Sequence, residues 1–236
     1  MEAPGLTEAQ QQEFGRRVEG LSKQITDMPL VPREGFRAVL PMTALEREVF
    51  GLQAAVLRAQ RKPGLRVWKT HRWDPLDPSQ EPNGEAQPVL EVRTMSNEYR
   101  ADVLNLTNAA ETDQTVRVQL EGLPGGTNPD YVQVHEVLTV GTRRFVAVSA
   151  ALPPARKEGD DYAVTVPAGM TKQLWFGFHP TAVEPGEHRG RVVLRSSSGD
   201  TREVELRLRL YPLRFPDATT LLLGGWDYTD GGGGRG

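Results

Sequence analysis

The sequence predicts a mainly β protein with an α-helical N-terminal part, in which a helical hairpin precedes a β-sandwich, and three observations support this. Apolar side chains in residues 1–62 recur every three or four positions, which is the period of an amphipathic helix. From residue 88 onward apolar and polar residues alternate, which is the period of a strand with one buried face. Finally, 24 glycines and 18 prolines favour many turns and argue against an all-helical protein.

The composition excludes several classes of function. A net charge of -3 and an isoelectric point near 5.9 give none of the basic excess that marks nucleic-acid binders. The chain has no cysteine, which excludes disulfides, thiolate metal sites and a cysteine nucleophile. It also has no apolar run of about 18 residues and no visible secretory signal. We therefore expect neither a nucleic-acid partner nor a membrane span.

Two helices are expected in residues 1–62, and a capping box introduces each. Thr7 with Gln10 gives T-x-x-Q, and Thr43 with Glu46 gives T-x-x-E. The apolar residues that follow, spaced by four, three and four, are Phe14, Val18, Leu21 and Ile25 in the first helix and Leu45, Val49, Leu52 and Val56 in the second. We expect an antiparallel hairpin that packs on the neighbouring domain. A longer coiled coil that continues upstream is the alternative.

Residues 63–87 form a connector that contains tryptophan and proline, with a short strand expected at residues 66–70. Three prolines exclude a helix there: Pro75, Pro78 and Pro82. Paired tryptophans on a loop can stack on a sugar ring, so Trp68 and Trp73 are candidate carbohydrate-binding residues. The structural alternative is that they cover the edge of a core, because an indole buries a large area while its N–H needs a partner.

Residues 88–216 are expected to form the sandwich. The clearest strand, residues 203–211, places its apolar side chains on one face and its charged side chains on the other. Residues 115–120 and 162–166 alternate similarly. The remaining strands are expected at residues 89–94, 99–107, 131–137, 143–149, 171–179 and 188–196. Roughly nine short strands separated by turns are typical of an antiparallel, immunoglobulin-like β-sandwich.

Several motifs in residues 88–216 give the chain a resemblance to bacterial β-sandwich modules. The matching residues are Pro167, Gly169, Thr171 and Trp175 in a P-x-G-x-T-x-x-x-W strand, Pro185, Gly186, Glu187 and Gly190 in a P-G-x-x-x-G turn, Pro212 and Pro216 at the exit, and Asn97, Glu98 and Tyr99 at the start of the sheet. The segment resembles modules that precede (β/α)8 barrels in large glycoside-hydrolase-like proteins, and it is similar to sandwich modules associated with α-galactosidases. The resemblance implies an extracytoplasmic bacterial protein whose sandwich flanks a downstream catalytic domain.

The residues that could carry chemistry are sparse. Glycosidases commonly need two carboxylates at a defined separation, whereas the carboxylates of residues 88–216 fall in turns or on solvated strand faces. The four histidines lack the spacing of a zinc site, and the acidic turn at residues 159–161 is by itself weak evidence for calcium. We expect no catalytic residue, no metal and no cofactor in this chain.

Residues 217–236 contain a linker and then an apolar run, TTLLLGGW, before a glycine-rich end. Such a run fits the first strand of a (β/α)8 barrel, which is buried on both faces. Trp226 and Asp227 would then lie where barrel active sites are built, and they complete the candidate carbohydrate-binding residues. A final edge strand followed by a glycine tail is the alternative. Under the first interpretation the chain is a fragment that is inactive alone.

Three hypotheses about function follow from these patterns. The first is a non-catalytic accessory or structural β-sandwich of a carbohydrate-active bacterial protein, which braces or flanks a downstream barrel domain. The second is a stand-alone module that binds a polysaccharide itself. The third is an envelope or adhesion module without a sugar ligand.

Overall fold

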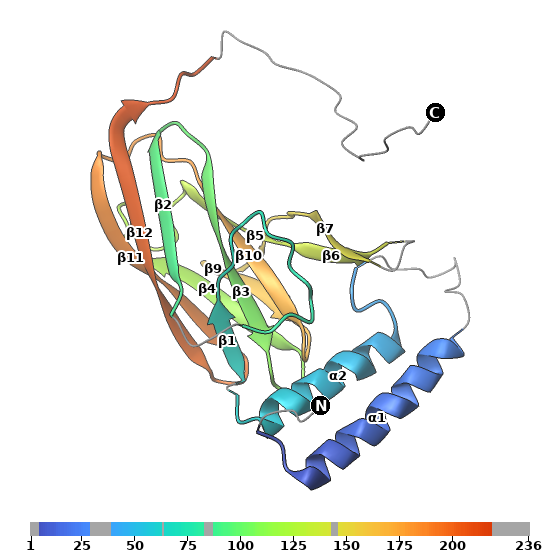
Figure 1. The fold of residues 1–236 in the computed structure, drawn as a ribbon. Helices are drawn as coiled ribbons and strands as arrows, with labels where there is room; N and C mark the ends of the chain where they lie inside the picture. The colour runs from blue at the N-terminus through green and yellow to red at the C-terminus, as the bar shows by residue number, and fades with distance from the viewer. Residues whose placement is uncertain (1–4, 29–38, 63, 83–86, 143–145, 219–236) are drawn as a thin grey trace, which may run out of the picture.

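The N-terminal part of the chain is a pair of helices at one end of a β-sandwich (Figure 1). The computed structural model describes residues 5–28, 39–62, 64–82, 87–142 and 146–218. Helices α1 (Glu8–Thr26) and α2 (Ala44–Ala59) lie side by side, and both predicted capping boxes are present. Within the described residues, neither helix is long and apolar enough to cross a membrane.

Twelve strands in the described residues form two main sheets and one hairpin. The first sheet has the order β1 (Leu65–Trp68), β3 (Arg100–Asn108), β10 (Thr171–Phe178) and β5 (Val132–Glu136). The second has the order β2 (Val89–Ser96), β12 (Thr201–Arg214), β11 (Gly186–Ser196), β4 (Gln114–Glu121), β9 (Asp161–Val166) and β8 (Arg156–Glu158). The hairpin pairs β6 (Leu138–Gly141) with β7 (Ala147–Ala151). The predicted mainly β sandwich with two N-terminal helices is confirmed.

The pairing of β2 with β12 differs from the antiparallel sheet that the sequence predicts. These two strands run parallel, whereas the other strand pairs of the described residues are antiparallel. A parallel pair needs a long connection between its strands, and most of the sandwich connects β2 to β12. The strands β6 and β8 were also not predicted.

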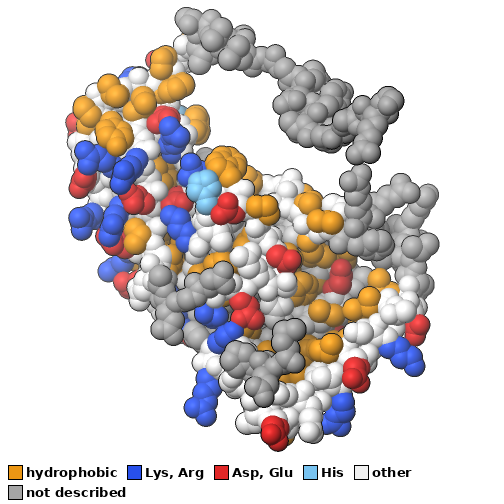
Figure 2. Space-filling view, viewed as in Figure 1, with side chains coloured by type: hydrophobic (Ala, Val, Ile, Leu, Met, Phe, Trp, Pro, Cys, Tyr) orange, Lys and Arg blue, Asp and Glu red, His pale blue; other side chains and the backbone are white. Residues whose placement is uncertain are grey.

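The core lies between the two sheets and follows the predicted alternation. In β12, Val204, Leu206 and Leu208 are buried, and in β10 the buried aromatic residues are Phe176 and Phe178. Burying each such side chain contributes about 1.5–3 kcal/mol. On the outer face of β11 and β12, basic and acidic side chains are interspersed, as Figure 2 shows. The alternation therefore sets which face of the sheet contacts water.

The predicted apolar stripes of the helices are only partly buried. Helix α1 has no buried residue, and Val18 and Ile25 are 51% and 53% exposed. In α2 the buried residues are Leu52, Ala54 and Leu57, so Leu52 alone was in the predicted stripe. The difference arises because α2 contacts both α1 and the sandwich, and a single stripe describes only one contacting face.

Helix α2 contacts the sandwich at the turn before β10, where Gly169 has a positive φ of 73°. A Cβ on Gly169 would lie 1.8 Å from the carbonyl oxygen of Phe50 and 3.1 Å from the backbone nitrogen of Ala54. Asp113 joins the two parts, because it accepts a hydrogen bond from the Ala168 backbone (3.1 Å) and pairs with Arg47 of α2 (3.4 Å). Glycine at position 169 therefore permits the helix backbone to approach the sheet.

Candidate carbohydrate-binding groove

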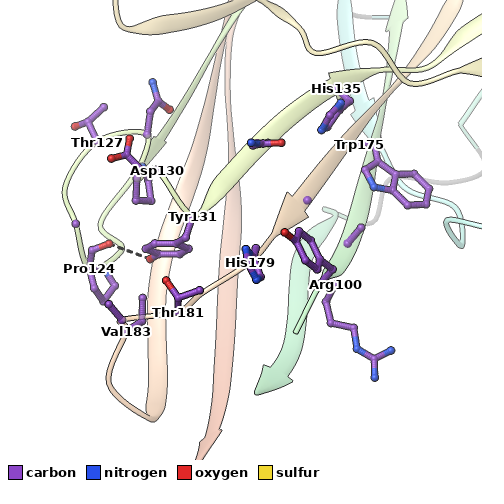
Figure 3. Close-up of a pocket in the computed structure, with 18 of the residues that line it drawn as sticks. Arg100, Pro124, Thr127, Asp130, Tyr131, His135, Trp175, His179, Thr181 and Val183 are labelled. Carbon is purple, nitrogen blue, oxygen red and sulfur yellow. Dashed lines mark hydrogen bonds between the residues drawn. The ribbon is translucent and has the colours of Figure 1, made fainter. Parts of the chain in front are cut away.

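An open groove with a volume of about 1050 Å³ crosses the outer face of the sheet formed by β3, β10 and β5 (Figure 3). We call it the aromatic groove, and its aromatic lining residues are Trp73, Tyr99, Tyr131, His135, Trp175 and His179. Gly177 of β10 pairs with Ala101 of β3 on one side and with Gln133 of β5 on the other. The floor of the groove is low there, because neither Gly177 nor Ala101 has a side chain longer than a methyl group.

Two tryptophans from distant parts of the sequence meet at one side of the groove. Trp73 lies in the connector and is 70% exposed, and its ring centroid is 5.4 Å from that of Trp175. The two ring planes meet at 62°, which is the edge-to-face arrangement that aromatic pairs favour. Trp175 lies on β10 between the core residues Leu174 and Phe176, so its side chain points to the opposite face of the sheet.

Tyr99 is held in place by His179 beneath it. The two rings stack with centroids 3.8 Å apart and planes within 10°, and Tyr99 remains 77% exposed. His179 Nε2 lies 3.1 Å from Asn97 Oδ1, and the Asn97 backbone N–H donates to the Pro180 carbonyl (2.7 Å). The exposed face of Tyr99 is therefore oriented before any ligand arrives.

Tyr131 and the loop before it form the opposite side of the groove. The Tyr131 hydroxyl donates a hydrogen bond to the Pro124 carbonyl (2.9 Å), as Figure 3 shows. Burial raises the pKa of Tyr131 to about 12, so the hydroxyl stays protonated at neutral pH. Asp130 contributes the single carboxylate among the described residues that line the groove.

The structure separates the two tryptophans that the sequence proposed as one platform. Trp73 lies in the aromatic groove, whereas Trp68 is only 7% exposed and is not among the lining residues. The Trp68 indole N–H donates to Thr107 Oγ1 (2.9 Å), which lies 2.7 Å from Thr171 Oγ1. A buried indole has no free face for a sugar, so the geometry of Trp68 fits the structural alternative.

The predicted residues Trp226 and Asp227 lie outside the described residues. In contrast, sequence reasoning did not select Tyr99, Tyr131, Trp175 and His179 for the site. A signal was present in β10, since Trp175 alternates with core residues and so had to face outward. No comparable signal marks Tyr99 or Tyr131, which come from segments about 30 residues apart.

The groups that line the groove are suited to recognition of a ligand. The described part of the chain contains no group of three or more histidine, aspartate or glutamate residues placed to hold a metal ion. The groove instead presents aromatic faces, the Gln133 amide, the Thr127 hydroxyl and backbone groups of the loop before Tyr131. Convergent aromatic and polar groups in a concave surface are typical of a ligand-binding site.

Comparisons with known proteins identify no family. No protein-family model matches the chain, and no curated protein matches its sequence. Among solved structures, a family 123 glycoside hydrolase from Clostridium perfringens matches 53% of this chain and 23% of its own, with 9% identity and a TM-score of 0.38. The chain thus spans about a quarter of the length of that hydrolase.

Two further solved structures are similar at the same distant level. The ASH/PapD-like domain of human CEP192 matches 80% of this chain and 100% of its own, with 10% identity and a TM-score of 0.34. The CsuC–CsuE chaperone–tip adhesion subunit complex of Acinetobacter baumannii matches 64% of this chain and 54% of its own, with 11% identity and a TM-score of 0.31. At these TM-scores the similarities support no argument about function.

Proposed function

We propose that this chain is a non-catalytic accessory β-sandwich of a carbohydrate-active protein, and that it binds a polysaccharide in the aromatic groove. One observation carries the proposal: Trp73, Trp175, Tyr99 and Tyr131 converge on one open groove whose floor is kept low by Gly177. Trp73 and Tyr99 are exposed, and Trp175 and Tyr131 are partly buried beside them. Exposed aromatic residues grouped in this way mark an interaction site.

The physical basis for sugar binding is the amphipathic character of both partners. A pyranose ring has apolar C–H faces and a polar edge, and an aromatic ring buries a large apolar area against such a face. Hydroxyl groups at the edge of the sugar would find donors and acceptors in Gln133 and Thr127, which line the same groove. The groove is open and its lining spans β3, β10 and β5, which suits a chain rather than a small enclosed ligand.

A groove-filling variant tests this proposal without disturbing the fold. A Cβ at Gly177 would meet only the Gln133 carbonyl oxygen, at an ordinary 3.8 Å, and Gly177 is not among the glycines with positive φ. Gly177→Val should therefore preserve the sheet, since β-branched residues suit strands, and its side chain would stand in the groove. Isothermal titration with a panel of plant and algal polysaccharides is expected to show binding to the wild type and none to Gly177→Val.

Two results would contradict the proposal. One is the absence of heat from every polysaccharide with the folded wild-type protein. The other is equal affinity of Gly177→Val and the wild type for the polysaccharide that binds. Trp73→Ala serves as a second variant, because removal of this exposed ring takes away half of the tryptophan pair while the core stays intact.

We also propose that the sandwich flanks a further domain, and the end of β12 supports this. The Asn97 side-chain amide donates to the Phe215 carbonyl and to Asp217 Oδ1, both at 3.1 Å, and the Phe215 N–H donates to the Ser96 carbonyl (2.8 Å). We call these contacts the exit clasp. Leu213 and Phe215 are exposed beside it, and Figure 2 shows hydrophobic side chains gathered where β12 ends.

The coding sequence downstream tests this second proposal. Repeated strand–helix units of about 30 residues would indicate the barrel that the exit clasp and its apolar neighbours would support. Further sandwich repeats without a barrel would contradict it and favour an envelope or adhesion module.

A further inference from the structure

We propose that the aromatic groove selects an acidic polysaccharide, one that carries carboxylate or sulfate groups, and that Arg72 binds the acidic group. This inference rests on the proposed polysaccharide-binding function and names the class of glycan. It follows from where the positive charges of the groove lie and from which of them are already paired.

Arg72 lies beside the tryptophan pair. Its guanidinium carbon is 5.8 Å from the centre of the Trp73 ring, a distance at which a cation is attracted to the ring face. Arg72 lines both the aromatic groove and an adjoining hollow of about 360 Å³, and the two hollows share Arg72, Arg100 and Ala101. A glycan that packs on the tryptophans would therefore pass within reach of this guanidinium group.

The cations around Arg72 already have partners. Lys69 pairs with Asp102 (2.5 Å), Arg93 with Glu91 (2.8 Å) and Arg100 with Glu98 (2.7 Å). Within the described residues, Arg72 forms no ion pair and no side-chain hydrogen bond. The carboxylates of Glu91 and Asp102 line the adjoining hollow, but they pair with Arg93 and Lys69, so Arg72 is a partly buried cation that no described carboxylate pairs with.

An arginine in a groove that forms no ion pair has a specific chemical preference. A guanidinium group presents a rigid fork of N–H donors that matches the two oxygens of a carboxylate or a sulfate. The one described carboxylate that lines the groove, Asp130, lies on the side away from Trp175 in Figure 3. The charge therefore differs across the groove, and its positive side coincides with the tryptophan pair.

The experiment compares acidic glycans with neutral forms of the same backbone. The probes are oligogalacturonate and oligomannuronate, each with its methyl ester, and a sulfated galactan oligosaccharide with its desulfated form. Isothermal titration should show at least one acidic probe binding ten times more tightly than its neutral counterpart. This preference should weaken as salt rises, because a partly exposed ion pair is screened.

Matched arginine variants assign the preference to a residue. Arg72→Gln should weaken the affinity for the acidic probe by about tenfold, which corresponds to about 1.4 kcal/mol. The affinity for the neutral counterpart should stay unchanged. Arg93→Gln is the control, because Arg93 lines the adjoining hollow but not the groove and is paired with Glu91. Arg93→Gln should leave both affinities unchanged.

The possible results separate this inference from the proposed function. Equal affinity for acidic and neutral forms, lost in Gly177→Val, would overturn acid selection and leave polysaccharide binding standing. A preference for acidic probes that survives Arg72→Gln or Gly177→Val would overturn the assignment to this site. Absence of binding by any acidic or neutral glycan would overturn the inference together with the proposed function.

Discussion

Replacing Gly169 with alanine should loosen the contact between α2 and the sandwich. The positive φ of Gly169 (73°) costs a residue with a Cβ about 1 kcal/mol. In addition, the new Cβ would lie 1.8 Å from the Phe50 carbonyl oxygen, whereas an ordinary contact needs about 3.5 Å. Because the opposing atoms belong to a helix backbone, no side-chain rotation can relieve the overlap.

The magnitude follows from what the helix buries. To restore an ordinary contact, α2 and the turn must separate by about 1.7 Å, which is close to the radius of a methyl group. Leu57 lies one turn after Ala54 on the same face of α2 and is fully buried. Partial exposure of Leu57 and its neighbours costs about 2–3 kcal/mol, so Gly169→Ala should lower the free energy of unfolding by about 3–4 kcal/mol.

A matched glycine isolates the packing contribution. Gly159 has a similar backbone angle (φ 64°), but an added Cβ would meet no atom within 4 Å. Gly159→Ala should therefore cost only about 1 kcal/mol, the backbone part alone. Urea unfolding measures both variants, and hydrogen exchange should show faster exchange in α2 only for Gly169→Ala. Equal destabilisation of the two variants would refute the argument that Gly169 is required for helix contact.

Three further predictions concern the groove, the connector and the sheet. The folded pKa of Tyr131 is raised above its unfolded value near 10, so its contribution to the free energy of unfolding should be complete below pH 10 and be lost as the pH rises towards 12. Urea unfolding at several pH values should show a smaller loss of stability with rising pH in Tyr131→Phe than in the wild type. Asp102 is buried and accepts hydrogen bonds from Lys69 (2.5 Å) and the Glu91 N–H (2.8 Å), so Asp102→Ala should cost about 3 kcal/mol in the same assay, and a cost below 1 kcal/mol would contradict this. Trp68→Ala should lower the free energy of unfolding by about 3–5 kcal/mol and Trp73→Ala by less than about 0.5 kcal/mol, and similar costs for both would show that their burial was misassigned.

Local patterns in the sequence were sufficient to predict both helices and most strands of this fold, but not β6 and β8. The capping boxes at Thr7 and Thr43 set the start of each helix, and the alternation in residues 203–211 set the buried face of β12. These features are encoded by neighbours in the sequence. The parallel pairing of β2 with β12 could not be predicted in this way, because it depends on which distant strands meet.

The candidate site was harder to predict because its residues meet only through the sheet order. Tyr99, Tyr131 and Trp175 belong to three segments that become neighbours when β10 lies between β3 and β5. Trp68 and Trp73 are five positions apart, yet only Trp73 faces the groove. Their difference depends on the path of the connector, in which Pro78 and Gln80 accept hydrogen bonds from Thr171, and composition does not specify that path.

The Asn97 side chain joins the aromatic groove to the exit clasp. Its oxygen contacts the histidine beneath Tyr99, and its nitrogen contacts the Phe215 carbonyl. A half-turn of this amide would place oxygen against oxygen at Phe215 and break that bond. The Asn97 amide therefore fixes the position of the Tyr99–His179 stack relative to the chain segment at Phe215. A polysaccharide bound on Tyr99 would therefore lie at a fixed angle to the direction in which the polypeptide leaves β12. The sandwich would hold its ligand in a fixed orientation relative to whatever follows β12.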